Sequence, residues 1–491
     1  MIKNFKWLIL VSLSFVACNN DDDNSAPVEV PVTSGTASFT KYVALGDSFA
    51  AGYSDGALFK KGQEGSYVNI LAEQFVTAGG GDFKTPFTSD NLGGLLLGGN
   101  VIAGTRLYFK VSTMSPTPVA GVPTTEVTTK VTGPFSNLGV PGAKSYHLIA
   151  PGYGNVAGVA TGAANPYFAR FATASGTTVL ADALVQAPTF FSLWIGGNDV
   201  LGYATSGGVG VNQTGNLNPA TYGGNDITDP NVFASVYSGL VNGLTANGAK
   251  GVVANLPYVN TLPYFTTVPY NPVPLTAGVA TQLNGGYATY NGGLQFAAAN
   301  GLITAAEATR RTVKFVAGSN AVVIVDSYLT NLSAYGIPSY RQATAEDLPV
   351  LTSRTFIGTL VGGNPAAVNG ASVPLADQWI LTKDEIAEVK VATDAYNVTI
   401  KAIADAKGLA FVDSKAIMTQ LSNGGIVSNS FTLTSAYVTG GAFSLDGVHP
   451  GPRGYALITN AFMAAINAKY SSTLKPVNLS LYPILYPAVI Q

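Results

Sequence analysis

The chain has 491 residues, of which 47% are hydrophobic and 11% are charged. This composition excludes a disordered chain, which is poor in apolar residues and high in net charge, and it is sufficient for a large core. The formal net charge is −2 and no basic stripe stands out, so we expect no nucleic-acid partner.

The first 18 residues have the features of an export signal. Lys3 and Lys6 precede an apolar run at 7–17, which is too short to span a membrane. Cys18, the single cysteine of the chain, follows directly. Residues 14–18 resemble a bacterial lipobox in which Phe15 replaces the usual Leu. We predict a lipoprotein signal peptide at 1–18, lipidated at Cys18, with an ordinary secretory signal as the alternative. An intrachain disulfide is excluded because it needs a second cysteine.

Residues 19–40 are predicted to form a solvated tether. Aspartates occupy positions 21–23, and Pro, Val, Thr and Ser follow them. An acidic cluster behind the lipid cysteine resembles the surface-export signal of Bacteroidetes lipoproteins. That resemblance implies an exported protein, lipid-anchored to the outer membrane and facing the cell exterior. A Ca²⁺ site is not indicated, because EF-hand loops place ligands at alternate positions and use a distal Glu.

Alternating strands and helices are predicted within 41–470. Short apolar runs that end at Gly, Pro or Asp predict buried strands at 41–45, 189–195, 251–256, 321–326 and 409–413. Helices are predicted at 66–77, 383–407 and 452–470. The second helix begins with a capping box, Thr382 and Glu385, and ends at Gly408. This alternation predicts an α/β domain whose parallel sheet is covered on both faces.

Long stretches rich in Gly, Thr, Asn and Pro interrupt these elements. They lie near 79–130, 203–230, 262–278 and 336–380. Structureless loops of this length are uncommon in compact domains, so we interpret them as functional insertions. The C-terminal tail, 471–491, has no clear periodicity, and no structure is predicted for it.

Four short segments combine a strand end or a turn with a chemically useful group. Ser48 follows the first strand, where ligands bind in parallel α/β sheets. Gly142 lies in a Gly- and Pro-containing turn whose amides can approach a ligand. Asn198 follows the strand at 189–195, and a side-chain amide there can donate to an oxyanion. His449 follows Asp446 by three residues, so the carboxylate can orient the imidazole. Each segment taken alone is also compatible with a plain turn or a surface loop.

In this order, the four segments resemble the blocks of the GDSL/SGNH hydrolase family. The family's D-x-x-H-P element is matched by Asp446 to Pro450, whereas the first block is GDSF instead of GDSL. The resemblance covers about 41–470 and implies a flavodoxin-like, three-layer α/β/α sandwich with a central parallel sheet of five strands. It implies Ser48 as nucleophile, His449 as base and Asp446 as orienting acid.

The same resemblance implies an oxyanion hole formed by the amides of Ser48 and Gly142 and the side chain of Asn198. Neither a metal nor an organic cofactor is required by this chemistry.

Four other residues or motifs are of the same type as the predicted site residues but lack the neighbouring structure that a site requires. Ser54 lies in a G-x-S-x-G pattern, but the pattern begins after the strand-to-helix turn that a nucleophile elbow requires. A second Gly-Gly-Asn-Asp, at 223–226, has no strand before it and is interpreted as a turn. His147 has no nearby acid in sequence, and Asp199 is expected to stabilise a turn.

The sequence therefore predicts an ester hydrolase acting on lipid or carboxylic esters. A carbohydrate esterase that removes acetyl groups from a polysaccharide is the alternative within the same fold. A surface binding protein that lost catalysis is the alternative from another class. Two apolar stretches, 95–97 and 256–275, are expected either to contact acyl chains or to serve internal packing. The oligomeric state does not follow from the sequence.

Overall fold

The structure is a computed structural model that describes residues 31–428 and 431–490. The predicted signal peptide, Cys18 and residues 19–30 of the predicted tether lie outside the described residues. Val32–Gln491 group into one compact unit.

The domain begins earlier in the chain than the sequence predicted. Residues 32–40, expected in the tether, pack against the domain: Ala37 and Phe39 are buried in the core. The ring of Phe39 stacks on that of Phe75, with 3.8 Å between centroids. The apolar side chains in this segment favour burial over solvation, which the Pro- and Thr-rich composition concealed.

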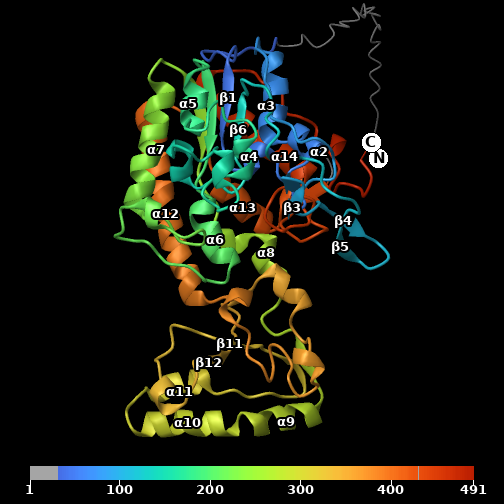
Figure 1. Cartoon of the computed structure of the whole chain (residues 1–491), viewed down its shortest axis with the longest axis vertical. Coiled ribbons are helices and arrows are strands. Elements are labelled where there is room, and N and C mark those ends of the chain that lie inside the picture. Colours follow the sequence, from blue (N-terminus) through green and yellow to red (C-terminus); the bar gives the residue numbers. More distant parts are fainter. Residues whose placement is uncertain (1–30, 429–430, 491) are drawn as a thin grey trace, which may run out of the picture. The chain divides into compact units, whose positions relative to one another are not determined.

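A five-stranded parallel sheet forms the centre of the domain (Figure 1). Its strands, in spatial order, are β15 (Ala410–Val412), β8 (Lys250–Ala254), β7 (Phe190–Trp194), β1 (Tyr42–Gly46) and β6 (Asn137–Gly139). All four strand pairs are parallel. β1 and β7 are buried along their whole length, as expected for strands covered on both faces. The predicted three-layer α/β fold is confirmed.

Helices cover both faces of the sheet (Figure 1). α3 (Tyr67–Val76) and α14 (Pro452–Tyr470) pack together on one face. α5 (Val179–Leu184), α7 (Pro230–Thr245) and α12 (Lys383–Lys407) cover the other. The bounds of α12 and α14 agree with the prediction because their end signals are strong. In α12, Glu385 accepts a hydrogen bond from the Thr382 amide, and Gly408 ends the helix in the left-handed conformation.

Short elements complete the fold. The other helices are α1 (Ser48–Ala51), α2 (Lys60–Glu64), α4 (Pro166–Ala169), α6 (Asn198–Thr205), α8 (Pro263–Thr266), α9 (Ala277–Gly286), α10 (Ala288–Ala299), α11 (Ala305–Arg311) and α13 (Ser414–Ser422). The two-stranded antiparallel sheets are β2 (Leu95–Leu97) with β3 (Asn100–Ala103), β4 (Leu107–Lys110) with β5 (Ser115–Pro118), β9 (Val273–Leu275) with β10 (Gly318–Asn320), β11 (Val323–Val325) with β12 (Tyr340–Gln342), β13 (Leu348–Pro349) with β14 (Ile380–Leu381), and β16 (Ile426–Ser428) with β17 (Phe431–Leu433).

The strand predicted at 321–326 is not part of the central sheet. β11 pairs antiparallel with β12 and belongs to a separate hydrophobic cluster within the chain between β8 and α12. Asp326, which ends this strand, accepts from Arg341 at 2.5 Å, and Arg341 also donates to Asp347 at 2.6 Å. A short apolar run therefore identified a strand correctly but not the sheet that it joins.

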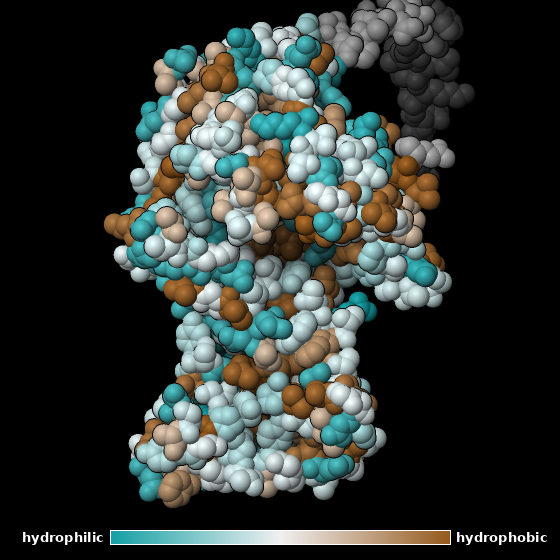
Figure 2. All heavy atoms as spheres, viewed as in Figure 1, coloured by the Kyte–Doolittle hydropathy of each residue, from teal (hydrophilic) through white to brown (hydrophobic). Residues whose placement is uncertain are grey.

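The C-terminal tail is part of the packed domain. Leu474 and Leu479 join the main core, and Tyr486 is buried against α2. The visible face of the molecule mixes hydrophilic and hydrophobic residues and contains a hollow with hydrophobic walls (Figure 2). Within the described residues, no helix is both long and apolar enough to cross a membrane.

Candidate active site

Ser48 lies at the carboxyl end of β1, on the sharp turn into α1. β1 ends at Gly46, and Ser48 is the first residue of the helix. The carboxylate of Asp47 accepts a hydrogen bond from the Phe49 amide at 3.0 Å and thereby caps α1. Burial raises the pKa of Asp47 to about 6. This turn presents Ser48 at the edge of the sheet where parallel strands end.

The structure brings the three predicted catalytic side chains into one hydrogen-bonded chain. Ser48 Oγ lies 2.8 Å from His449 Nε2, and His449 Nδ1 lies 2.9 Å from Asp446 Oδ2. The serine and the histidine are 401 positions apart in sequence. The order nucleophile, base and acid is that of a Ser-His-Asp triad.

Asp446 is held as an ionised acceptor. Its Oδ1 accepts from the amides of Val448 at 2.9 Å and His449 at 2.8 Å, and its Oδ2 accepts from the Gly56 amide at 3.0 Å. Burial pushes the pKa of Asp446 up, but the charge and hydrogen bonds of His449, together with the backbone amides, outweigh burial and lower it to about 2. The carboxylate therefore stays negative beside the imidazole.

The loop that carries the histidine is bound to the loop after α1. Ser54 is fully buried, and its hydroxyl donates to the Pro450 carbonyl at 3.0 Å. Asp55 accepts from the Leu445 amide at 2.9 Å. The Ser54 hydroxyl therefore bonds to the loop that carries His449 and makes no hydrogen bond to the imidazole.

The predicted oxyanion-hole residues border the same serine-bearing edge of the sheet. Asn198 is the first residue of α6, and its Nδ2 donates to the Ala143 carbonyl at 2.9 Å, which leaves the second amide hydrogen for a ligand. The amides of Ser48 and Gly142 make no hydrogen bond within the described part of the chain. Gly196 has φ +121°, and a Cβ there would lie 2.7 Å from the Phe233 ring, so the turn before Asn198 requires glycine.

Two buried polar side chains outside the predicted site fix the loops of the predicted oxyanion hole. Asp199 accepts from the amide and hydroxyl of Ser145, at 2.8 and 2.7 Å, and so ties α6 to the segment after Gly142. Asn165 donates to the Pro141 carbonyl at 2.8 Å. The sequence predicted that Asp199 stabilises its own turn, whereas its carboxylate bonds a segment 54 residues away in the chain. Asn165 was missed, since no local pattern links it to position 141.

The remaining decoys have structural roles. The second Gly-Gly-Asn-Asp forms a turn in which Asp226 accepts from the Gly223 amide at 2.7 Å. His147 stacks on Tyr153 with 4.3 Å between ring centroids, and its Nδ1 accepts from the Lys144 amide. Burial, aided by the Lys144 charge, lowers the pKa of His147 to about 4, so the ring is neutral near pH 7.

The two apolar stretches proposed for acyl contact differ in their surroundings. Leu95 is buried in a small cluster with Val127 and Ala169, which is internal packing. Pro257 and Leu262, from the second stretch, line an apolar cavity together with Phe49, the residue after Ser48. Among residues 31–428 and 431–490, no three His, Cys, Asp or Glu side chains are arranged to hold a metal ion.

Comparison with family models gives no match, and neither does comparison with curated proteins. Three solved structures are similar over 88% of this chain. They are an alpha/beta hydrolase from the metagenome of Lake Arreo, Spain (TM-score 0.32, 10% identity, 96% of that chain), an acetyl xylan esterase variant from Geobacillus stearothermophilus (0.31, 12%, 95%) and an extracellular lipase from Streptomyces rimosus (0.29, 13%, 99%). The interpretation of the site therefore rests on its own geometry.

Proposed function

We propose that this protein is a serine ester hydrolase of the GDSL/SGNH type that cleaves carboxylic or lipid esters. The observation that carries the proposal is the continuous chain from Ser48 Oγ through His449 to Asp446, with contacts of 2.8 and 2.9 Å. A serine hydroxyl at its free pKa is a weak nucleophile, and an oriented imidazole within hydrogen-bond distance activates it.

In the proposed reaction, Ser48 Oγ attacks the ester carbonyl carbon while His449 Nε2 takes the hydroxyl proton. The carbonyl oxygen becomes negative and is stabilised by the Ser48 and Gly142 amides and by Asn198 Nδ2. Collapse of this intermediate breaks the bond to the alcohol oxygen, which receives the proton from His449. Water then attacks the acyl-Ser48 ester with His449 again as base, and the acid and free serine are released.

The proposal is tested with a panel of p-nitrophenyl esters from acetyl to palmitoyl. We expect Ser48→Ala to abolish hydrolysis while Ser54→Ala, the matched change at the neighbouring decoy, retains most of it. Circular dichroism establishes that both variants are folded. Loss of activity in Ser54→Ala with retention in Ser48→Ala contradicts the nucleophile assignment.

If the wild-type protein hydrolyses none of these esters, acetylated polysaccharide is the next substrate. Turnover there supports the carbohydrate-esterase alternative. Silence on both substrates supports a binding protein.

We also propose that the protein is exported and anchored to the outer membrane by a lipid on Cys18, facing the cell exterior. Support comes from the charged and apolar pattern of residues 1–17 and the acidic cluster after the cysteine. In this arrangement the domain from Val32 onward acts on substrates outside the cell.

A further inference from the structure

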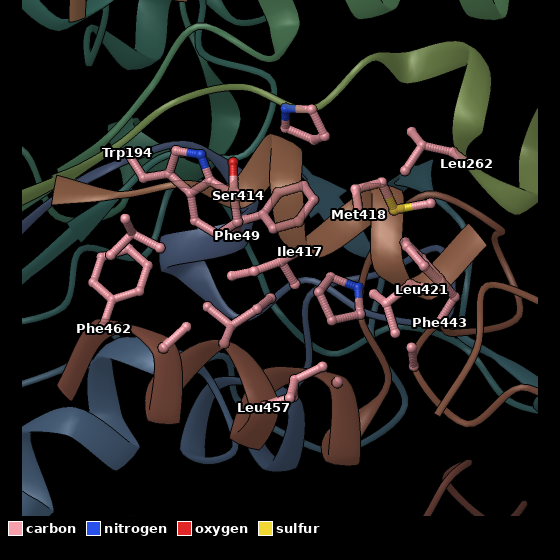
Figure 3. Close-up of a pocket in the computed structure, with 17 residues that line it drawn as sticks. Phe49, Trp194, Leu262, Ser414, Ile417, Met418, Leu421, Phe443, Leu457 and Phe462 are labelled. Atoms are coloured by element: carbon pink, nitrogen blue, oxygen red, sulfur yellow. The ribbon is translucent and has the colours of Figure 1, made fainter. Parts of the chain in front are cut away.

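A partly enclosed apolar cavity of about 60 Å³ lies next to the proposed catalytic serine and histidine. One wall comes from α14 and includes Leu457 and Phe462, and a second comes from α13 and includes Ile417 and Met418 (Figure 3). Apart from Ser414, the lining side chains in the described part of the chain are apolar. The hydroxyl of Ser414 donates to the Asn255 carbonyl and so does not need a partner inside the cavity.

The cavity borders the site at two residues. Phe49 follows the nucleophile and Pro450 follows the base, and both line the cavity. The Phe49 ring lies between the Trp194 ring, at 5.0 Å, and the His449 ring, at 5.5 Å. Phe49 is half-buried, so its ring is not locked in the core. It therefore separates the catalytic groups from the apolar space behind them.

We propose that this cavity receives the acyl chain of the substrate, with Phe49 as the gate that turns aside when the chain enters. The inference rests on the proposed ester hydrolysis and specifies its substrate class. Water and sugar hydroxyls gain little from binding between apolar walls, because they lose hydrogen bonds there. An alkyl chain gains from the same surroundings, since burial removes it from water.

The cavity volume sets the length of the chain. A water-sized group requires roughly 15 Å³ of such space, so the cavity accommodates about four methylene-sized groups. The matching substrate is a hexanoyl ester, in which four carbons follow the carbonyl and its neighbouring carbon. Acetyl esters leave the cavity unused, and palmitoyl esters exceed it.

The test compares two Ala→Phe variants on α14. Ala461 lines the cavity, whereas Ala465, one turn further along the same helix and equally half-buried, packs against the core outside it. Each buried methylene raises kcat/KM about fourfold, so filling the cavity with Ala461→Phe is expected to lower the hexanoyl-to-acetyl ratio of kcat/KM about tenfold or more. Ala465→Phe is expected to leave this ratio within about twofold.

A second variant covers the case in which Ala461→Phe does not fold. Leu457→Ala enlarges the cavity and is expected to raise the octanoyl-to-hexanoyl ratio. An unchanged chain-length profile in folded Ala461→Phe and Leu457→Ala overturns the inference, although Ser48-dependent hydrolysis leaves the proposed function standing.

Binding is measured separately from turnover. Saturation-transfer NMR with hexanoate on Ser48→Ala is expected to show saturable binding that Ala461→Phe, added to that variant, removes. If no ester is hydrolysed but this binding pattern is found, the proposed function is wrong and the cavity is still an acyl-chain binding site. Absence of hexanoate binding overturns the site.

Discussion

Replacing Asp446 with Asn tests the role of the orienting acid. The carboxylate accepts four hydrogen bonds, two at each oxygen: the Val448 and His449 amides at Oδ1, and His449 Nδ1 and the Gly56 amide at Oδ2. Asparagine has a single side-chain oxygen, so it can replace only one of the two carboxylate oxygens. If it serves the two amides at the Oδ1 position, its NH₂ faces His449 Nδ1.

That NH₂ group donates to Nδ1 and moves the imidazole proton to Nε2. A protonated Nε2 faces Ser48 Oγ and cannot take its proton. We expect kcat to fall by about 10⁴, or about 5 kcal/mol of transition-state stabilisation, because the base is held in the wrong tautomer. The Gly56 amide also loses its acceptor, and because Gly56 is exposed the free energy of unfolding should fall by only about 0.5–1.5 kcal/mol.

The assay measures kcat on p-nitrophenyl hexanoate. Urea unfolding of the same preparations gives the free energy of unfolding. Asp226→Asn is the matched control: Asp226 is also buried and accepts from the Val211 and Gly223 amides, but it lies in the decoy turn. This control should lose stability while kcat stays within about threefold. If Asp446→Asn retains more than about a tenth of the wild-type kcat, the tautomer argument is refuted.

Three further predictions concern the oxyanion hole, pH and the anchor. Asn198→Ala should lower kcat by about 10²–10³ with little change in KM, and an effect on KM alone contradicts its role. Burial raises the pKa of Asp55 from 3.8 to about 7, so the folded protein keeps a proton that the unfolded chain releases. The free energy of unfolding should therefore fall as the pH rises from about 4 to about 7, and Asp55→Asn should flatten this slope in urea titrations. If the pH dependence of the free energy of unfolding is unchanged in Asp55→Asn, other groups cause it. Cys18→Ala, expressed in a host that processes lipoproteins, should move the protein to the soluble fraction, and unchanged membrane partitioning excludes the anchor.

Local signals predicted the elements that carry the site. The strand before Ser48 is marked by an apolar run that ends at glycine, and Asp446 and His449 are only three residues apart. Each signal lies within a few consecutive residues, so it can be recognised from the sequence alone. The same is true of α12, whose first turn and last turn each carry a capping motif.

Helices α9 and α10 could not be predicted in the same way. They contain two Gly-Gly pairs, which disfavour a helix, and their apolar residues have weak periodicity. Long-range bonds compensate: Asn284 pairs in both directions with the backbone of Phe315, and Asn291 pairs likewise with Val313. Tertiary contacts that override propensity are not visible in a local pattern.

The position of His449, the proposed catalytic base, depends on segments that are far apart in the sequence. The Tyr264 amide, from the insertion after β8, donates to the Gly447 carbonyl at 2.9 Å. Gly447 has φ +74°, and a Cβ there would lie 3.0 Å from the Tyr264 nitrogen, so the insertion approaches as closely as a glycine permits. On its other side, the base loop is bonded to Ser54 and Asp55. The imidazole is therefore aligned with Ser48 by contacts from both sides, and the insertion contributes to the geometry of the site as well as to its surroundings.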